Sequence, residues 1–413
     1  MNILFLSAQD FKEKSIQVIR KTPEAYVKHN IGVHYVVERD MSKHGNYYYE
    51  DEINPKGVKV YRFEVPLAKL RNRFNNGPIL ALLQKLAKYI SIVKLAVSGS
   101  KVLKNEQIDI CYGYGVNGVL AANLLKLVGK LKGIKLISRF QGTFYFTEMI
   151  KEKKILKSLF NWEGFLSLYL PADLCILTND GTQGDMVLSK IHSKNLRNMK
   201  FWPNGVDEQK LPKHEVERLE KIYNPKNKTI VVTVCRLVKV KRVDRGIEAF
   251  SKVVNEMNVK NIEYIIIGEG TERGRLEELA KKLNVSQYIK FVGSIKNEQV
   301  KEYLNVADIF LSTYDVSNVG NPLLEAIRAN KAIITLNNGD TASWIKHNEN
   351  GYIYDVNENT TQSLALGLAR LHEDVAERER IINAIKLTEN EKLWTWDERM
   401  NTEVGVVKKL ADY

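Results

Sequence analysis

Short apolar runs alternate along the chain with longer segments in which apolar residues recur every three or four positions. The short runs predict buried β-strands and the longer segments predict amphipathic α-helices. Such alternation predicts a parallel sheet with helices on its faces. In the first half, the predicted strands are Ile3–Ser7, Gly32–Val37, Val58–Phe63, Ile108–Tyr112, Lys135–Arg139 and Leu174–Thr178, and the predicted helices include Ile79–Val97 and Val119–Leu127.

The second half repeats this pattern. Its predicted strands are Ile230–Val234, Glu263–Ile267, Ile289–Val292, Ile309–Ser312 and Ala332–Leu336, and its predicted helices are Val243–Glu256, Arg273–Leu283, Asn297–Leu304 and Leu323–Ala329. Between the halves, Phe201–Asp207 carries a proline and a glycine and leads into a charged, strand-poor stretch that ends at Lys228. We therefore predict an α/β protein in which two Rossmann-like domains, residues 1–205 and 206–392, face each other across a cleft.

Composition favours a protein of the cytoplasm. The chain has 413 residues, 44% of them hydrophobic, and its three cysteines lie far apart in or beside apolar runs, which predicts reduced thiols rather than a disulfide or zinc framework. The opening apolar run, Ile3–Leu6, is too short for a secretory signal. No apolar run approaches the roughly 18–20 residues that span a bilayer.

The net charge of +13 is unevenly distributed. Residues 1–205 contain 31 Lys and Arg against 17 Asp and Glu, whereas residues 206–413 contain 31 against 32. A basic half attracts nucleic acid, an anionic membrane or a phosphate-bearing substrate. No nucleic-acid-binding module is recognisable, and lysines interleave with apolar residues around residues 69–97 and 151–162. We therefore expect a peripheral position on the inner face of an anionic membrane.

The segment 315–325 joins a loop of small residues to a helix. It follows the predicted strand Ile309–Ser312, and Asn321 and Pro322 suit the N-cap and the first position of the next helix. Such a loop offers free amide N–H groups and the positive end of the helix dipole to an anion. Glu325 lies one turn inside the helix. Alone, the segment also fits an ordinary strand-to-helix turn; as a site, it suits a phosphorylated sugar or a nucleotide.

Arg236 and Lys241 form a second candidate site. They follow the predicted strand Ile230–Val234 at its carboxyl end, the edge at which open α/β sheets bind ligands. Arginine can bind a phosphate through two hydrogen bonds, and lysine acts as a point charge. The run also fits a solvated basic loop, but its combination with the segment 315–325 favours a diphosphate site.

These motifs resemble the retaining glycosyltransferases of the GT-B fold (group 1, family 4-like). The resemblance runs in order through Asn204–Asp207, Arg236–Asp244, Ile265–Gly270, Phe291–Gly293 and Ser317–Glu325. It implies transfer of a sugar from a nucleotide-diphosphate sugar to a hydroxyl acceptor, a glycan or lipid-linked glycan bound by the first domain. It also implies retention by a front-face route, in which a donor phosphate oxygen deprotonates the acceptor.

The resemblance assigns roles to single residues. Those matching Arg236 and Lys241 bind the diphosphate, the one matching Glu325 binds the ribose, and the turn at Ser294 and Ile295 approaches the base. The implied donor-binding residues are Arg236, Lys241, Ser294, Ile295, Asn318, Val319, Gly320, Asn321 and Glu325, and the implied catalytic residues are Arg236, Lys241, Gln141 and Ser317. In this fold the last helix crosses back to the first domain, which we expect of residues 393–413.

Two positions depart from the family pattern. Ser317 stands where relatives usually carry the first of two glutamates, and Gln141, followed by Gly142, stands where many carry a histidine. Glutamine forms hydrogen bonds but cannot carry a proton at neutral pH. These departures keep open an alternative, a sugar-binding subunit that has lost catalysis.

A further alternative is a nicotinamide-dependent oxidoreductase. Gly113–Gly118 has the spacing Gly-x-Gly-x-x-Gly between a predicted strand and a helix. The motif falls late in its domain, and no acidic residue lies between Asp109 and Glu148 to bind a ribose. No Asp-x-Asp occurs to bind a metal ion. We therefore expect neither a cofactor nor a metal, and Arg236, Lys241 and the helix amides would stabilise the leaving group.

Overall fold

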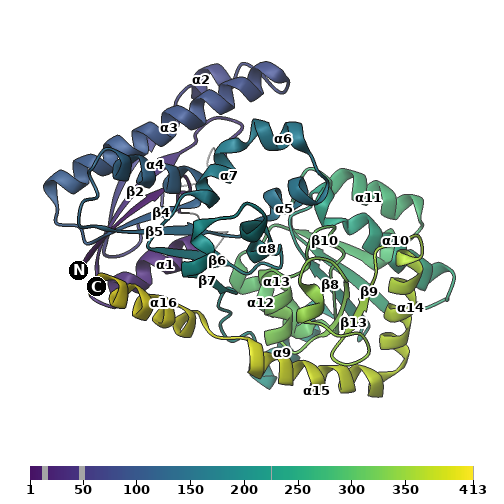
Figure 1. Cartoon of the computed structure of the whole chain (residues 1–413). Helices are drawn as coiled ribbons and strands as arrows, with labels where there is room; N and C mark the ends of the chain where they lie inside the picture. Colours follow the sequence, from purple (N-terminus) through teal and green to yellow (C-terminus); the bar gives the residue numbers. More distant parts are fainter. Residues whose placement is uncertain (12–16, 46–51, 225, 413) are drawn as a thin grey trace. The chain divides into compact units, whose positions relative to one another are not determined.

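The computed structural model describes residues 1–11, 17–45, 52–224 and 226–412, and the chain divides into two compact units (Figure 1). The N-terminal unit comprises Met1–Asn179, Gln183–Asn204 and Asp397–Tyr413. The C-terminal unit comprises Asp180–Thr182 and Gly205–Trp396. Each unit is built on one parallel sheet.

In its described part, the N-terminal unit has a sheet of seven strands in the order β3-β2-β1-β4-β5-β6-β7. The strands are β1 (Asn2–Ser7), β2 (Gly32–Arg39), β3 (Val58–Glu64), β4 (Ile110–Tyr114), β5 (Lys135–Phe140), β6 (Leu174–Thr178) and β7 (Met199–Trp202). The helices are α1 (Gln17–Lys28), α2 (Ala68–Arg71), α3 (Pro78–Asn105), α4 (Gly115–Leu127), α5 (Phe144–Lys151), α6 (Ile155–Phe160), α7 (Trp162–Tyr169) and α8 (Gly184–Lys190). Strands β1, β4, β5 and β6 are buried almost throughout, as strands covered by helices on both faces must be.

The C-terminal unit has six strands in its described part, in the order β10-β9-β8-β11-β12-β13. They are β8 (Thr229–Val234), β9 (Ile262–Ile267), β10 (Ile289–Gly293), β11 (Ile309–Leu311), β12 (Ala332–Leu336) and β13 (Tyr352–Tyr354). Its helices are α9 (Lys213–Tyr223), α10 (Val243–Asn255), α11 (Arg273–Lys282), α12 (Asn297–Val306), α13 (Asn321–Arg328), α14 (Thr360–Glu373) and α15 (Val375–Lys392). In each sheet the chain adds its first three strands in one direction and then returns to the other side of the first strand, which is the Rossmann strand order.

The predicted fold class, two Rossmann-like parallel-sheet units, is confirmed, and every predicted strand is present. The sequence pattern missed β7 and β13. Both are short, with four and three residues, and only partly buried, so their apolar pattern is weak. The helix predicted at Leu323–Ala329 begins at Asn321, and Gly320 is its N-cap. The assignment of Asn321 as the cap was therefore wrong by one residue.

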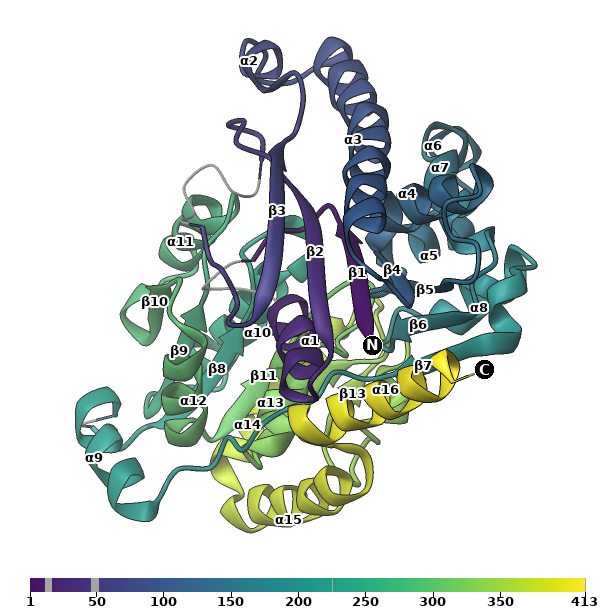
Figure 2. The same cartoon turned by 90° about the vertical axis from the view of Figure 1, so that its left-hand side faces the viewer.

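The last helix, α16 (Trp396–Ala411), lies against the N-terminal unit beside α1 (Figure 2). Glu403 of α16 is fully buried and lies 2.8 Å from Arg399 and 3.4 Å from Arg139 of β5. The hydroxyls of Tyr112 and Tyr26 donate to Glu403 at 2.8 and 3.2 Å. Burial opposes ionisation, but the two arginines hold the pKa of Glu403 below its usual range.

The glycines of the Gly113–Gly118 motif have a packing role. Gly113 lies inside β4 and Gly118 inside α4. A Cβ atom on Gly118 would lie 2.0 Å from the carbonyl oxygen of Leu6, and one on Gly113 would lie 2.7 Å from the Cα of Val119. These glycines therefore let α4 lie directly on the backbone of β1 and β4.

Candidate functional site

The candidate site lies in the C-terminal unit, where the order of strands reverses. The chain continues from β8 to its neighbour β9, whereas β11 pairs with β8 on the other side. The loops after β8 and β11 therefore leave the sheet at its topological switch point, where α/β sheets bind ligands. They carry Arg236 with Lys241 and the segment 315–321, respectively.

Lys241, on the loop that follows β8, packs against the loop that follows β11. Its Nζ atom is 3.7 Å from the centre of the Tyr314 ring, a cation–π contact. The amide of Asp315 donates to the carbonyl of Val240 at 3.1 Å, which ties the two loops together. Burial lowers the pKa of Lys241 to about 8, although Cys235 and Asp180 oppose this shift. Arg236, in contrast, is exposed and free to meet a ligand.

Ser317 and Asn318 have structural contacts in the loop after β11. The Ser317 hydroxyl donates to the carbonyl of Asp180 at 3.2 Å and accepts from the amide of Val319 at 3.1 Å. Asn318 is buried, accepts from the amide of Tyr314 at 3.0 Å and donates to Asn338 at 2.8 Å. These contacts fix the loop, and they engage the Val319 amide that we expected to face a phosphate.

Helix α13 carries Glu325 in its second turn. Gly320 precedes the helix with an extended backbone, and Asn321 and Pro322 open it. Amides in the first turn of a helix lack the carbonyl partners that later turns provide, and among them the amide of Leu324 donates to the carbonyl of Gly320 at 3.1 Å. Glu325 is 6% exposed, and burial raises the pKa of its carboxyl to about 7. A buried acid beside a helix N-terminus is suited to accept hydrogen bonds from ligand hydroxyls.

Ser294 and Ile295 follow β10. Gly293 ends the strand with a φ of +87° and accepts a hydrogen bond from the amide of Gly268 at 2.9 Å. Ser294 is exposed, whereas Ile295 packs against the core of the C-terminal unit. Of these two predicted base contacts, Ser294 has the accessible side chain.

Gln141 belongs to the N-terminal unit. It follows β5, and its Nε2 atom donates a hydrogen bond to the hydroxyl of Tyr114, at the end of β4. The structure thus brings Arg236, Lys241, Ser317–Asn321 and Glu325 onto one sheet edge of the C-terminal unit, with Gln141 on the other unit.

Asp180 was missed by the sequence analysis. Residues 180–182 belong to the C-terminal unit. There the amide of Asp340 donates to the carbonyl of Gly181 at 3.0 Å, and the hydroxyl of Ser317 donates to the carbonyl of Asp180. Burial raises the pKa of Asp180 to about 6, against the hydrogen bonds from Thr182. The positive charge of Lys241 also opposes this rise in the pKa of Asp180. The Asp-Gly pair after the strand Leu174–Thr178 was the available signal.

Neither a metal-binding cluster nor a membrane-spanning helix occurs among the described residues. They contain no cluster of three or more His, Cys, Asp or Glu side chains arranged to hold a metal ion. Within the same ranges, no helix is both long and apolar enough to cross a membrane.

Part of the chain is similar to known glycosyltransferases. Residues 216–388 match the family described as glycosyl transferases group 1. N-acetyl-alpha-D-glucosaminyl L-malate synthase of Bacillus anthracis is 29% identical over 182 residues, which are 43% of this chain and 46% of that protein. Alpha-monoglucosyldiacylglycerol synthase of Acholeplasma laidlawii is 28% identical over 135 residues, 33% of each chain. The matches span less than half the length of these curated relatives.

The likeness to solved structures extends over the whole chain. HepE of Anabaena, in complex with UDP and glucose, has a TM-score of 0.72 and 15% identity over 99% of both chains. Two Rossmann-like units of this kind define the GT-B class of fold. Residues 216–388, less than half of the chain, match the model of the glycosyl transferases of group 1, in agreement with the family resemblance carried by Arg236, Lys241 and Ser317–Glu325.

Proposed function

We propose that this protein transfers a sugar from a nucleotide-diphosphate sugar to a hydroxyl of a glycan or lipid-linked glycan, with retention of configuration. The observation that carries the proposal is the position of Lys241 at the switch point: its Nζ atom lies 3.7 Å from the centre of the Tyr314 ring, and its loop is hydrogen-bonded to the loop that leads into α13. A cation next to a helix N-terminus suits a diphosphate. The structural neighbour with UDP bound supports a nucleotide-diphosphate donor.

In the proposed reaction, the bond between the anomeric carbon and the diphosphate oxygen breaks, and its electron pair stays with the leaving nucleotide. The acceptor oxygen bonds to the same face of the sugar, and its proton passes to a phosphate oxygen of the donor. Arg236, Lys241 and the amides of α13 would stabilise the charge of the leaving group electrostatically. We propose that no metal ion or other cofactor is needed for this step.

Substitution of Arg236 and Glu325 tests the site. We expect Arg236→Ala to lower kcat/KM on the order of 100-fold or more, because it removes a cation from the leaving group. Glu325→Ala should mainly raise KM for the donor, because it removes the expected ribose contact. Arg218→Ala is the matched control, since Arg218 is exposed on α9 and pairs only with Glu215 among the described residues. Unchanged release of nucleoside diphosphate by both variants would refute the site assignment.

A sugar-binding subunit without catalysis is the second candidate. Its support is Ser317, whose hydroxyl is engaged by Asp180 and Val319 in place of the glutamate of relatives. A thermal-shift screen of uridine and guanosine diphosphates and their sugars, with NAD as the comparison, separates the candidates. Stabilisation by a nucleotide sugar without turnover would favour the subunit, and stabilisation by NAD alone would favour the oxidoreductase.

We also propose that the N-terminal unit binds an anionic membrane surface, where a lipid-linked acceptor would lie. No residue of α6 is buried, and Ile155, Leu156, Leu159 and Phe160 are exposed, followed by Trp162 on α7. The exposed Lys153 and Lys157 flank these residues. An exposed apolar helix edged with lysines and a tryptophan suits the interface of an anionic bilayer.

Liposome co-sedimentation tests the membrane proposal. We expect binding to anionic but not to neutral vesicles at low salt, and Leu156→Glu should weaken it, because it places a like charge at the bilayer surface. Leu156 is 83% exposed, so the substitution leaves the core intact. The control is Leu387→Glu on the C-terminal unit, where the residue is 64% exposed. Equal binding of both variants would count against this surface.

A further inference from the structure

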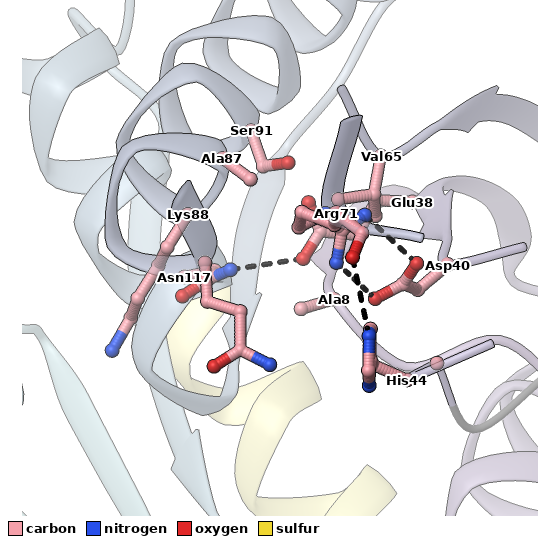
Figure 3. A pocket seen from close by; sticks show the side chains of 12 residues that line it. Ala8, Glu38, Asp40, His44, Val65, Arg71, Ala87, Lys88, Ser91 and Asn117 are labelled. Carbon is pink, nitrogen blue, oxygen red and sulfur yellow. Dashed lines mark hydrogen bonds and ion pairs between the residues drawn. The ribbon is translucent and has the colours of Figure 1, made fainter. Parts of the chain in front are cut away.

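A polar pocket of about 260 Å³ lies at the carboxyl edge of the sheet in the N-terminal unit (Figure 3). Ala8 and Val65 line it just beyond β1 and β3, and Glu38 lines it from β2. Lys88 and Ser91 of α3 and Asn117 of α4 form further parts of its wall. The volume corresponds to roughly nine water molecules, which suits one sugar ring and not a whole nucleotide.

Glu38 is a buried acid whose hydrogen bonds are incomplete. It is 5% exposed, and Asn117 donates to its Oε1 atom at 2.9 Å. Among the described residues, its Oε2 atom has no hydrogen-bond partner, and neither has the buried hydroxyl of Ser91. Burial raises the pKa of Glu38, and the hydroxyl of Ser91 opposes this shift. Both residues line the pocket, so a ligand hydroxyl that enters between them can satisfy both atoms.

The other charges of the pocket are already paired. Arg71 binds Asp40 through two hydrogen bonds of 2.8 and 2.9 Å. Lys88 lies 2.8 Å from Glu163 and shares its carboxylate with Lys85, which lies 2.7 Å from it. Glu38 is therefore the acid without an ion pair among the described pocket residues, and burial raises its pKa. The Glu38 carboxylate would repel a phosphate or carboxylate placed against it, whereas a neutral hydroxyl can donate to it.

We propose that this pocket binds a neutral, hydroxyl-bearing ring of the acceptor, a sugar or cyclic polyol without phosphate. One ligand hydroxyl donates to Oε2 of Glu38 and accepts from the hydroxyl of Ser91, and Asn117 holds the carboxylate in position. The assignment of this ring to the acceptor rests on the proposed glycosyl transfer. The binding of a neutral sugar ring in the pocket does not depend on that proposal.

Ligand-observed NMR titration of the full chain tests the pocket. The probes are neutral methyl hexopyranosides, with a hexosamine and a hexose 6-phosphate as charged counterparts. We expect the neutral glycosides to bind, and Glu38→Gln to raise their Kd about tenfold, because an amide N–H replaces the acceptor oxygen. Ser91→Ala should also weaken binding. This second variant keeps the pocket testable if the Glu38 variant does not fold. Glu106→Gln, outside the pocket, is the control.

The proposal is overturned if no neutral glycoside binds, if either charged probe binds in preference, or if both pocket variants bind like the wild type. The melting temperature with uridine or guanosine diphosphate is measured on the same samples. Neutral glycoside binding that depends on Glu38, without any nucleotide effect, would support the pocket while counting against the proposed glycosyl transfer.

Discussion

At the scale of single residues, burial moves three ionisable groups of the C-terminal unit toward neutrality. The pKa of Lys241 falls to about 8, and those of Asp180 and Glu325 rise to about 6 and about 7. Desolvation is the largest cause in each case, because a charge in a low-dielectric interior loses the hydration that stabilises it. An anionic ligand would favour the charged form of the lysine and would raise its pKa.

The affinity for a nucleoside diphosphate should therefore fall as the pH rises through about 8. Lys241 is a cation below its pKa of about 8 and neutral above it, so the attraction for the diphosphate weakens on the alkaline side. Isothermal titration with UDP or GDP between pH 7 and 9 measures the effect. Lys241→Arg should bind with little change over this range, since arginine stays charged. The same decline in this variant would assign the pH dependence to another group.

The types of residue in the sequence predicted where the candidate site lies on the C-terminal unit. They did not predict which contacts each of its side chains makes. Arg236, Lys241 and Glu325 stood out because charged residues at strand ends and helix starts form recognisable spacings. The engagement of Ser317 by the carbonyl of Asp180 was not predictable, because it joins residues 137 positions apart. A backbone contact of this kind leaves no pattern in the sequence.

At the scale of elements, periodicity predicted most strands and helices but misjudged their ends. Strand β4 begins at Ile110 and continues through Gly113, and α4 begins at Gly115. The glycine spacing suggested a ligand loop, but Gly118 instead lets α4 approach Leu6. The spacing alone does not distinguish a phosphate loop from close helix–strand packing, because both require the absence of a Cβ atom.

Gly118→Ala should lower the free energy of unfolding by about 1–3 kcal/mol, through overpacking. Its Cβ would lie 2.0 Å from the carbonyl oxygen of Leu6, so either α4 or β1 must shift. Gly405→Ala on the exposed face of α16 is the matched control, because a Cβ there meets nothing within 4 Å. It should stabilise by about 0.5–1 kcal/mol from helix propensity. Urea unfolding measures the stability of both variants, and equal unfolding midpoints would contradict the packing role of Gly118.

At the scale of the whole molecule, the chain returns to its first unit at the end. Residues from Asp397 onward lie with the N-terminal unit, and Glu403 enters its core between Arg139 and Arg399. An acid buried with two arginines and two tyrosines is costly to disturb, because removing it leaves uncompensated buried cations. This cluster therefore anchors α16.

Glu403→Ala should destabilise the protein by about 3–5 kcal/mol, since it breaks a buried ion pair from one side. Asp397→Ala removes an exposed ion pair with Lys28, 3.0 Å long, from the same helix, and should cost about 0–1 kcal/mol. Thermal unfolding followed by circular dichroism compares the two. Equal losses would mean that Glu403 does not anchor α16.

The sequence by itself determined the α/β class, the repeated Rossmann pattern, the group 1 motifs and the concentration of positive charge in the first half. These features are local, because strand and helix periodicity, turn residues and charge are properties of neighbouring positions. Only the tertiary structure decided the partners of Ser317, the buried pairing of Glu403 and the pocket around Glu38. Each depends on segments that are distant in sequence and are brought together when the apolar strands are buried. The alternation of apolar and polar residues predicts the strands but not which strands become neighbours in the sheet.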